Sequence, residues 1–246
     1  MDIKTVGIIG FGRFGRLLAD ILSDDFEVRH YKRGLANPNA LQEAASADAV
    51  FFSVAMLYLE EVVKKAKPFI RSDAAILDVC SVKLHPERVF REHFDMKNVL
   101  LTHPMFGPDS AKNGLTNLPI VLCPNADTRP DLLHYWDGYF RGKGLRAIHM
   151  SADAHDKNTA YSLCMTQLLG RVLERMKVTS SEIDTESFRN LLNIRDIAAN
   201  DSMDLFRGLQ TLNPYAKEMR EVLKTSLEAI EECLNTDPPD GVKDRE

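Results

Sequence analysis

The feature that most constrains the fold is a glycine-rich turn near the start of the chain, Gly10-Phe11-Gly12-Arg13-Phe14-Gly15. An apolar run of strand length, residues 6–9, precedes it, and an apolar stretch with helical spacing, residues 14–22, follows it. In such a turn the first glycine permits a tight bend, the second lets backbone amides approach a diphosphate, and the third lets the helix pack closely on the sheet. The diphosphate then faces unpaired N–H groups at the positive end of the helix. The motif predicts a dinucleotide site, with a purely structural turn as the alternative.

Short apolar runs continue over the first 150 residues. Beyond the first, runs of strand length occupy residues 26–31, 49–54, 75–79, 99–102, 119–122 and 145–150. Stretches with helical spacing, such as residues 57–69, separate the early ones. Strands that alternate with helices are typical of βαβ units and a mainly parallel sheet. Residues 1–150 are therefore predicted to form an α/β Rossmann-type domain with a mainly parallel sheet.

The second part of the chain has helical spacing only. One apolar series recurs every four residues, at Ala160, Cys164, Leu168, Val172 and Met176. A second series is close to a heptad seam, at Ala216, Met219, Leu223, Leu227, Ile230 and Leu234. We expect a smaller all-α domain over residues 151–235 that serves the substrate and dimerisation. The seam either packs within the chain or forms a homodimer through the helical domain, and residues 236–246, with two prolines and a glycine, are predicted to be a frayed tail.

Composition excludes several classes of protein. The 246 residues are 44% hydrophobic with a net charge of −5, so no basic excess indicates a nucleic-acid partner. No apolar run approaches the roughly 18 residues of a membrane span. No targeting segment is recognised at the N-terminus. The four cysteines are too scattered for a zinc site or a disulfide framework, so we expect no metal and a cytoplasmic location.

The end of the second predicted strand indicates which dinucleotide binds. NAD sites usually place an acidic residue there to bind the ribose 2′-hydroxyl, but this chain has His30-Tyr31-Lys32-Arg33. Two cations suit a 2′-phosphate, which a guanidinium binds with two hydrogen bonds, and Arg13 is expected to join them. The prediction is NADP, with an ordinary solvated loop as the alternative. Further cofactor contacts are assigned to the ends of the third and fourth predicted strands, at Ser53, Val54 and Cys80.

Two side chains at neighbouring strand ends suggest chemistry. Ser81 follows the fourth predicted strand, and His103 lies in a loop that Pro104 and Pro108 would stiffen. Ligands bind at the carboxyl ends of the strands in open α/β sheets. A histidine fixed there, within reach of a serine hydroxyl, fits a general base near neutral pH. A hydrogen-bonded turn histidine without a catalytic role is the alternative.

These motifs resemble those of a known family. The resemblance is carried by Ser81-Val82-Lys83 and Thr102-His103-Pro104-Met105-Phe106-Gly107-Pro108, and it extends through Asn117-Leu118-Pro119, His155-Asp156, Gly170-Arg171-Val172-Leu173-Glu174 and Asp201-Ser202-Met203-Asp204-Leu205-Phe206. The chain resembles the prephenate/arogenate dehydrogenases of tyrosine biosynthesis, and most of all their plant-type, NADP-dependent branch. The resemblance implies oxidative decarboxylation of a cyclohexadienyl substrate. His103 would accept the proton of the ring hydroxyl, and Ser81 would hydrogen-bond both that hydroxyl and the imidazole.

The substrate pocket departs from this pattern. Family members usually have a histidine where this chain has Gln167, and plant-type members have a glutamine where it has Leu163. Gln167 still donates a hydrogen bond to a carboxylate but carries no charge. Arg195 is the nearest candidate for a substrate-binding arginine of bacterial members, although it is one position out of register.

Two further positions match the plant-type pocket, Thr185 and Asp201. A carboxylate at 201 would pair with the ammonium group of arogenate and disfavour the keto group of prephenate. A helix cap before Met203 is the competing interpretation of Asp201.

Three rival functions remain open from the sequence. A prephenate dehydrogenase would make 4-hydroxyphenylpyruvate instead of tyrosine. A β-hydroxyacid dehydrogenase would need a lysine base in the helical domain, and no clear equivalent stands out. A non-catalytic NADP-binding regulatory protein would not need Ser81 and His103 together at strand ends.

Overall fold

A computed structural model describes residues 1–34 and 36–236 of the chain. Its first part is a seven-stranded sheet with the order β2-β1-β3-β4-β5-β6-β7. The strands are β1 (Thr5–Ile9), β2 (Glu27–Tyr31), β3 (Ala49–Phe52), β4 (Ala75–Asp78), β5 (Val99–Pro104), β6 (Pro119–Cys123) and β7 (Arg146–His149). Neighbouring strands are parallel except β5 and β6, which are antiparallel. The predicted, mainly parallel sheet is therefore confirmed.

The central strands are buried on both faces. Every residue of β3, β4 and β5 is buried, whereas the edge strands β2 and β7 contain exposed positions. Parallel strands that helices cover on both sides require such continuous burial. This is why these strands stand out in the sequence as uninterrupted apolar runs.

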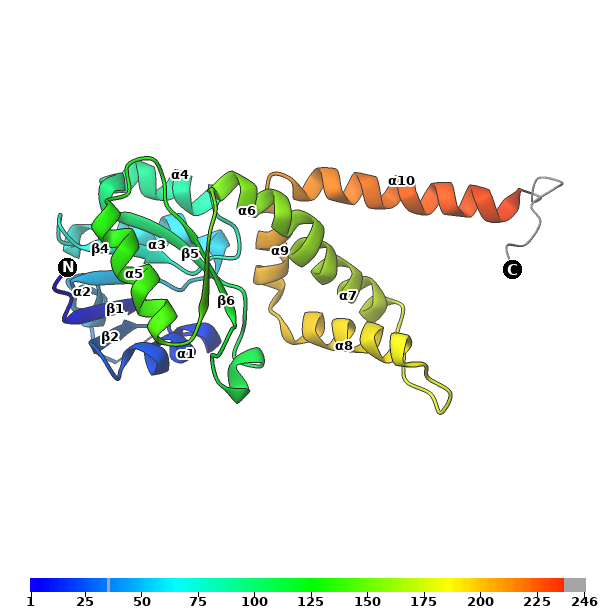
Figure 1. Cartoon of the computed structure of the whole chain (residues 1–246), viewed down its shortest axis with the longest axis horizontal. Helices are drawn as coiled ribbons and strands as arrows, with labels where there is room; N and C mark the ends of the chain where they lie inside the picture. The colour runs from blue at the N-terminus through cyan, green and yellow to red at the C-terminus, as the bar shows by residue number, and fades with distance from the viewer. Residues whose placement is uncertain (35, 237–246) are drawn as a thin grey trace.

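Helices cover both faces of the sheet (Figure 1). On one face, α1 (Arg13–Leu22) and α5 (Pro130–Gly142) pack through a core that includes Leu18, Trp136 and Phe140. The opposite face is covered by α2 (Ala40–Ala45), α3 (Leu59–Ala66) and α4 (Leu84–His93). Short 3₁₀ turns lie at η1 (Met56–Tyr58), η2 (Lys67–Phe69), η3 (Met96–Asn98) and η4 (Ser110–Asn113).

After β7 the described residues form helices only. These are α6 (Ala152–Thr159), α7 (Met165–Arg175), α8 (Glu186–Asn200), α9 (Met203–Leu212) and α10 (Ala216–Asn235). A π-helical turn, η5 (Ala160–Cys164), joins α6 to α7. The all-α composition of this part agrees with the expectation, and among the described residues no helix is long and apolar enough to cross a bilayer.

The helical part and the sheet share one hydrophobic core. Buried residues of α6, η5, α9 and α10 belong to the same cluster as β3 and β4, and they include Ala152, Cys164, Leu209 and Met219. Because side chains from both parts interdigitate there, the first turns of the helical part are fixed relative to the sheet. The division into two domains near residue 150 stays a prediction.

The outer portions of the helical part have fewer neighbours. Helices α7 and α8 approach closely at Gly170, where an added Cβ would lie 2.4 Å from the Cβ of Ala198. Helix α10 projects from the rest of the molecule (Figure 1), and its later seam residues Leu227, Ile230 and Leu234 are 59%, 58% and 80% exposed. The predicted frayed tail lies outside the described residues, except for residue 236.

Candidate active site

The glycine turn has the geometry that a dinucleotide needs. Gly10 has a φ of +107°, and a Cβ there would lie 2.2 Å from the carbonyl oxygen of Ser53. At Gly15 an added Cβ would lie 2.1 Å from the carbonyl oxygen of Gly10, whereas at Gly12 it would meet nothing within 4 Å. Gly12 is the N-cap of α1 and has no side-chain cap, so the first N–H groups of α1 are left for another acceptor. The turn fits a diphosphate at this open face.

The neighbouring strand ends complete this edge. Ser53 and Val54 follow β3 and lie against Gly10, because a Cβ on Gly10 would also come within 2.8 Å of the Val54 side chain. Lys32 and Arg33 follow β2 and are exposed. Phe11 stacks on the ring of His30, with ring centroids 3.8 Å apart. The predicted cofactor contacts from β1, β2 and β3 therefore meet at one edge of the sheet.

Two of the predicted cofactor contacts have other partners. Arg13 pairs with Asp109, with 2.8 Å between Nη2 and Oδ2, and its contact with the cofactor stays a prediction. Cys80 is buried in the core between sheet and helices, and burial raises the pKa of its thiol well above the ordinary value. Its side chain belongs to the packing of the sheet, and only its backbone remains for the cofactor edge.

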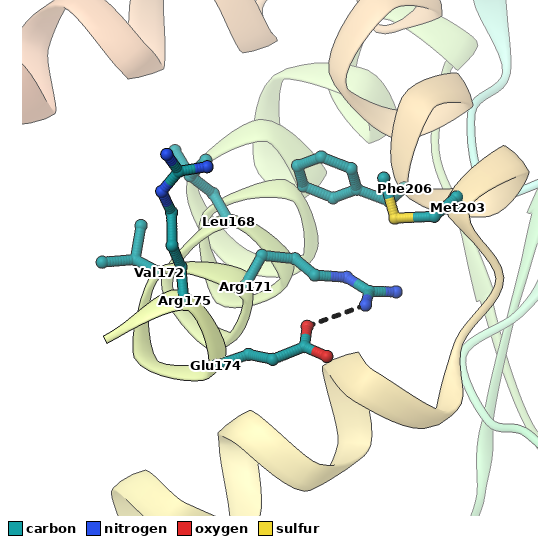
Figure 2. Close-up of a pocket in the computed structure, with 7 residues that line it drawn as sticks. All are labelled: Leu168, Arg171, Val172, Glu174, Arg175, Met203 and Phe206. Carbon is teal, nitrogen blue, oxygen red and sulfur yellow. Dashed lines mark hydrogen bonds and ion pairs between the residues drawn. The ribbon is translucent and has the colours of Figure 1, made fainter. Parts of the chain in front are cut away.

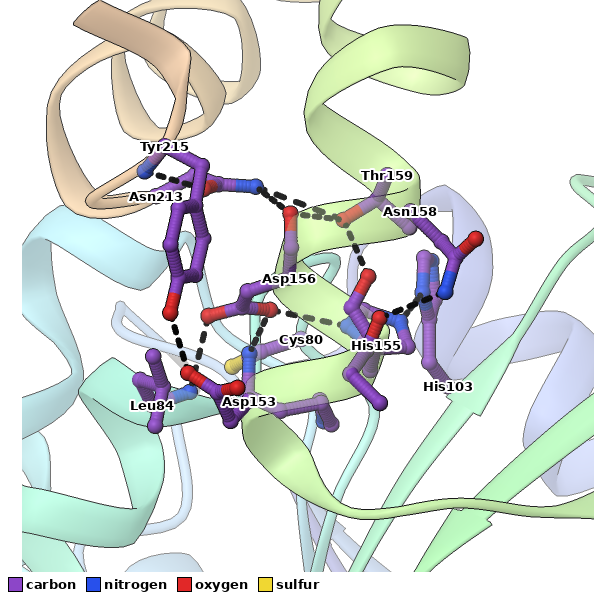
Figure 3. Close-up of polar contacts among 12 residues, drawn as sticks. Cys80, Leu84, His103, Asp153, His155, Asp156, Asn158, Thr159, Asn213 and Tyr215 are labelled. Atoms are coloured by element: carbon purple, nitrogen blue, oxygen red, sulfur yellow. Dashed lines mark hydrogen bonds and ion pairs between the residues drawn. The ribbon is translucent and has the colours of Figure 1, made fainter. Parts of the chain in front are cut away.

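His103 lies near the end of β5 and begins a buried chain of three polar side chains (Figure 3). Its Nδ1 lies 2.8 Å from Nε2 of His155, whose Nδ1 lies 2.8 Å from Oδ1 of Asp156. His103, His155 and Asp156 are 4%, 1% and 0% exposed. His155 and Asp156 come from α6, so the helical part supplies the groups that support the strand histidine.

Asp156 is bound at the start of another helix. Its two carboxylate oxygens accept hydrogen bonds from the backbone N–H groups of Lys83 and Leu84, at 2.8 and 2.9 Å. These residues are the N-cap and the first residue of α4, where N–H groups lack partners within the helix. The positive end of the helix dipole stabilises an anion in this position. The Asp156 carboxylate is thus fixed in place, and it forms the last member of the hydrogen-bonded series His103–His155–Asp156.

Ser81 does not contact the imidazole. It is half-buried in the turn after β4, and among the described residues no hydrogen bond joins it to His103. The predicted contact between Ser81 and the imidazole is replaced by His155, which occupies Nδ1 of His103. Because β4 and β5 are parallel neighbours, Ser81 and His103 still lie at the same edge of the sheet.

Charged neighbours and burial set the protonation of the two histidines. Burial lowers the pKa of His103 well below its ordinary value, with smaller contributions from His155 and Lys83. Burial also lowers the pKa of His155, although its hydrogen bond to Asp156 acts in the opposite direction. Lys83 itself forms a fully buried ion pair with Asp78. His103 is therefore neutral at physiological pH and has the state a base requires.

A second polar contact links α7 to the end of α8. Gln167 is 3% exposed, and its Nε2 donates to Oδ2 of Asp201 at 2.6 Å. Burial raises the pKa of Asp201, while Gln167, Arg13 and Arg171 lower it. Arg13 belongs to the glycine turn, so a charge of that turn acts on this carboxylate. Asp201 is not the N-cap of α9, because Ser202 holds that position and accepts from the Leu205 N–H; Asp201 is instead the C-cap residue of α8.

The structure does not bring Thr185 and Arg195 to this edge. Thr185 is the N-cap of α8, at the end of that helix farther from the sheet (Figure 1), and its hydroxyl accepts from the Phe188 N–H. Arg195 donates to the carbonyl of Val178 and to the carboxylate of Asp196. Both residues therefore serve the local structure of α8 within one chain.

A separate pocket lies between α7 and α9 (Figure 2). Its lining residues are Leu168, Arg171, Val172, Glu174, Arg175, Met203 and Phe206. Arg171 forms an ion pair with Glu174 and also donates to the backbone carbonyl of Asp201. The pocket therefore adjoins the Gln167–Asp201 contact but does not contain His103.

The sequence reasoning missed the roles of His155 and Asp156. Both residues carried the family resemblance, but no spacing rule linked them to His103, which lies 52 positions earlier. The only available signal was an adjacent histidine and acid at the start of a helix. No group of three or more His, Cys, Asp or Glu side chains suited to a metal occurs among the described residues.

Comparison with known proteins identifies the family. The model of "Prephenate dehydrogenase, nucleotide-binding domain" matches residues 24–149, and that of "TYRAAT1-like, C-terminal domain" matches residues 172–245. Arogenate dehydrogenase 2, chloroplastic, of Arabidopsis thaliana is 32% identical over 93% of this chain and 69% of its own length. Arogenate dehydrogenase 1, chloroplastic, of the same plant is 31% identical over 93% of this chain, which spans only 39% of that relative.

A solved structure shows the same fold. Prephenate dehydrogenase from A. aeolicus, in complex with hydroxyphenyl propionate and NAD⁺, superposes with a TM-score of 0.73 at 19% identity, covering 95% of this chain and 91% of that one. The nucleotide-binding fold and the position of Ser81 and His103 at neighbouring strand ends agree with a single family assignment. The chain belongs to the prephenate/arogenate dehydrogenase family, because its sequence matches the family model and the plant relatives.

Proposed function

We propose that the protein is an NADP-dependent arogenate dehydrogenase, which converts arogenate to tyrosine by oxidative decarboxylation. The observation that carries this proposal is a neutral, buried histidine, His103, at the same sheet edge as the open glycine turn. The names of the two plant relatives support the choice of substrate.

His103 acts as the general base. Its Nε2 has no protein hydrogen bond among the described residues, and it accepts the proton of the substrate's ring hydroxyl. A nicotinamide held at the glycine turn would supply the acceptor for the hydride that leaves the carbon carrying this hydroxyl. Loss of CO₂ leaves its bonding electron pair in the ring, which becomes aromatic. Ser81 hydrogen-bonds the hydroxyl and orients it, and a positioned base of this kind contributes about 10²–10⁴-fold to the rate.

The cofactor preference rests on the end of β2. Lys32 and Arg33 are exposed there, with no acid beside them in the sequence 30–33. A 2′-phosphate gains charge-assisted hydrogen bonds from such a pair, whereas a carboxylate would repel it. NADP is therefore the proposed coenzyme, in contrast to the NAD⁺ named for the A. aeolicus structure.

The substrate side chain is assigned to Asp201. Arogenate and prephenate differ at one group, an ammonium in the first and a keto oxygen in the second. A half-buried carboxylate favours the ammonium and faces a keto oxygen unfavourably. Gln167 holds this carboxylate through its amide nitrogen, so its own proposed role is to orient Asp201 toward the substrate.

Prephenate dehydrogenase activity is the second candidate. The matched family model and the A. aeolicus structure both carry that name. The deciding experiment measures kcat/KM for arogenate and for prephenate, each with NADP and with NAD, by the absorbance of the reduced coenzyme. The highest value is expected for arogenate with NADP. A higher value for prephenate contradicts the substrate assignment. Coenzyme binding without turnover of either substrate contradicts the proposal that the protein is an enzyme.

The helical part is proposed to form a homodimer. The apolar seam of α10 continues past its buried start, so Leu227, Ile230 and Leu234 lie exposed on a projecting helix. A second copy of the chain would cover this seam in the manner of a coiled coil. Light scattering is expected to give a dimer that becomes a monomer in Leu227→Glu, and a monomeric wild type at micromolar concentration contradicts the proposal. The cytoplasmic location stays a prediction, since both plant relatives are named as chloroplastic.

A further inference from the structure

The buried hydrogen-bonded series His103–His155–Asp156 contains a second imidazole, that of His155, besides the imidazole of the proposed base His103. His155 lies between the two residues, with hydrogen bonds of 2.8 Å on both sides. It is 1% exposed, so it is out of reach of solvent. A buried polar side chain between two polar partners restricts which of them donates and which accepts.

The direction of these hydrogen bonds follows from the carboxylate. An ionised Asp156 only accepts, and both its oxygens already accept backbone N–H groups of α4. Nδ1 of His155 must therefore carry the proton in the contact with Asp156. A neutral His155 then has its lone pair on Nε2, and this atom accepts from Nδ1–H of His103. The lone pair of His103 is left on Nε2.

We propose that His155, oriented by Asp156, is a positioning residue that keeps the base His103 in the tautomer with its proton on Nδ1 and its lone pair on Nε2. This inference rests on the proposed function for its catalytic meaning. The tautomer itself follows from the hydrogen bonds together with the neutral state of His155, whose pKa is lowered by burial. In the other tautomer Nε2 would carry a proton and could not accept one from the substrate hydroxyl.

The surroundings of the pair agree with this arrangement. The charged groups that act on the two histidines are Lys83 and Asp78, which form a buried ion pair, and Asp156. The carbonyl of Asp156 also accepts from Asn213 Nδ2 at 2.8 Å, which ties α6 to the segment between α9 and α10 (Figure 3). His155 is therefore fixed from three sides: by His103, by the start of α4 through Asp156, and by the backbone of α6.

The first test observes the tautomer without any turnover. The full-length protein is labelled with ¹⁵N-histidine, and long-range ¹H–¹⁵N correlation spectra identify which ring nitrogen of each histidine is protonated, with His103→Asn used for assignment. The expected result is an Nδ1-protonated, neutral His103 at neutral pH. A His103 protonated on Nε2 overturns the proposal.

The second test compares two replacements of His155. His155→Gln keeps an acceptor near the position of Nε2, and we expect kcat for arogenate to stay within about tenfold of wild type. His155→Phe keeps the ring but removes both nitrogens, and kcat is expected to fall by about 10²-fold or more, with the KM for NADP unchanged. His149→Gln is the matched control, because His149 also contacts an acid, Asp137, but is exposed and has no contact with His103.

The outcomes separate the proposal from a purely structural role of His155. Equal losses in the Gln and Phe variants, or a Phe variant within threefold of wild type, overturn it. If His155→Phe does not fold, the tautomer of His103 in the wild type and in His155→Gln decides the question. Absence of turnover with an Nδ1-protonated His103 contradicts the proposed function and leaves the tautomer intact.

Discussion

The two sides of the site are built in different ways. His103 belongs to a strand whose residues are all buried, and its partners are fixed at the start of α4. Gln167 and Asp201 lie on helices whose outer residues, such as Val172 and Ile197, are 44% and 51% exposed. Burial leaves little freedom to the proposed base, whereas the proposed substrate-side contact depends on two helices that other residues can repack. The contrast suggests that the chemistry is fixed by the sheet and that the choice of substrate is set by the helices.

The largest effect is expected from the sheet side. His103→Asn should lower kcat for arogenate by about 10²–10⁴-fold, because the asparagine cannot take the hydroxyl proton. NADP binding should persist, since the glycine turn is untouched, and a coenzyme titration measures this together with kcat. Near-wild-type turnover in this variant would contradict the role of His103 as the base. It would also contradict the inference that the sheet side of the site fixes the chemistry.

Asp201→Asn tests the helix side. The kcat/KM ratio of arogenate to prephenate should fall by about 10–100-fold, because a charge-assisted hydrogen bond to the ammonium is worth about 1.5–3 kcal/mol. Ser202→Ala is the control, since it removes the cap of α9 and costs about 1 kcal/mol of stability without touching the substrate. Equal ratios in Asp201→Asn and wild type would show that this carboxylate does not select the substrate.

The cofactor end of the sheet should respond more weakly. Arg33→Ala is expected to raise the KM for NADP by about tenfold, the equivalent of one charge-assisted contact, and to leave the KM for NAD unchanged. Arg29→Ala provides a matched control, because Arg29 is in β2 but pairs with Glu27. An unchanged NADP KM in Arg33→Ala contradicts the assigned phosphate contact.

The smallest effect on the reaction is expected at Asp48, a carboxylate directly before β3 that belongs to no part of the proposed site. Burial raises its pKa, but hydrogen bonds from the backbone and hydroxyl of Thr5, the backbone of Lys4 and the side chain of Arg71 outweigh this and lower the pKa to about 2. A depressed pKa contributes stability above the unfolded value, about 3.8, and this contribution disappears as the pH falls through about 2.

Asp48→Asn should therefore lower the free energy of unfolding by about 2 kcal/mol at pH 7, and by progressively less below pH 4. Urea unfolding at a series of pH values measures the difference, and kcat should not change. A loss that stays constant down to pH 2.5 would mean that the ionised carboxylate is not its source.

Local patterns predicted the sheet well because they report burial directly. The turn at Gly10 and Gly12 depends on residues that are adjacent in sequence, and so do the apolar runs of β3 and β4. His103 and Ser81 were placed at one edge because neighbouring parallel strands end together. These inferences needed only patterns formed by residues that are close to one another in the sequence.

The other contacts could not be predicted because they join distant segments. His155 reaches His103 from α6, and the salt bridge of Arg13 crosses to Asp109 in the loop after β5. Thr185 and Arg195 were placed in the pocket by resemblance, which gives positions along the chain but not the direction in which a helix presents its side chains. The structure assigns both to α8 itself.

The π-helical turn between α6 and α7 has a geometric consequence for the site. Successive residues of an α-helix are rotated by about 100°, so in a regular helix His155 and Gln167, twelve residues apart, would be separated by about 120° around the axis. A π turn accommodates one extra residue, which reduces that separation to about 20°. The single wide turn thus places His155 and Gln167 along one face of a continuous helix, whereas a regular α-helix with the same number of residues would separate the two side chains by about 100° more.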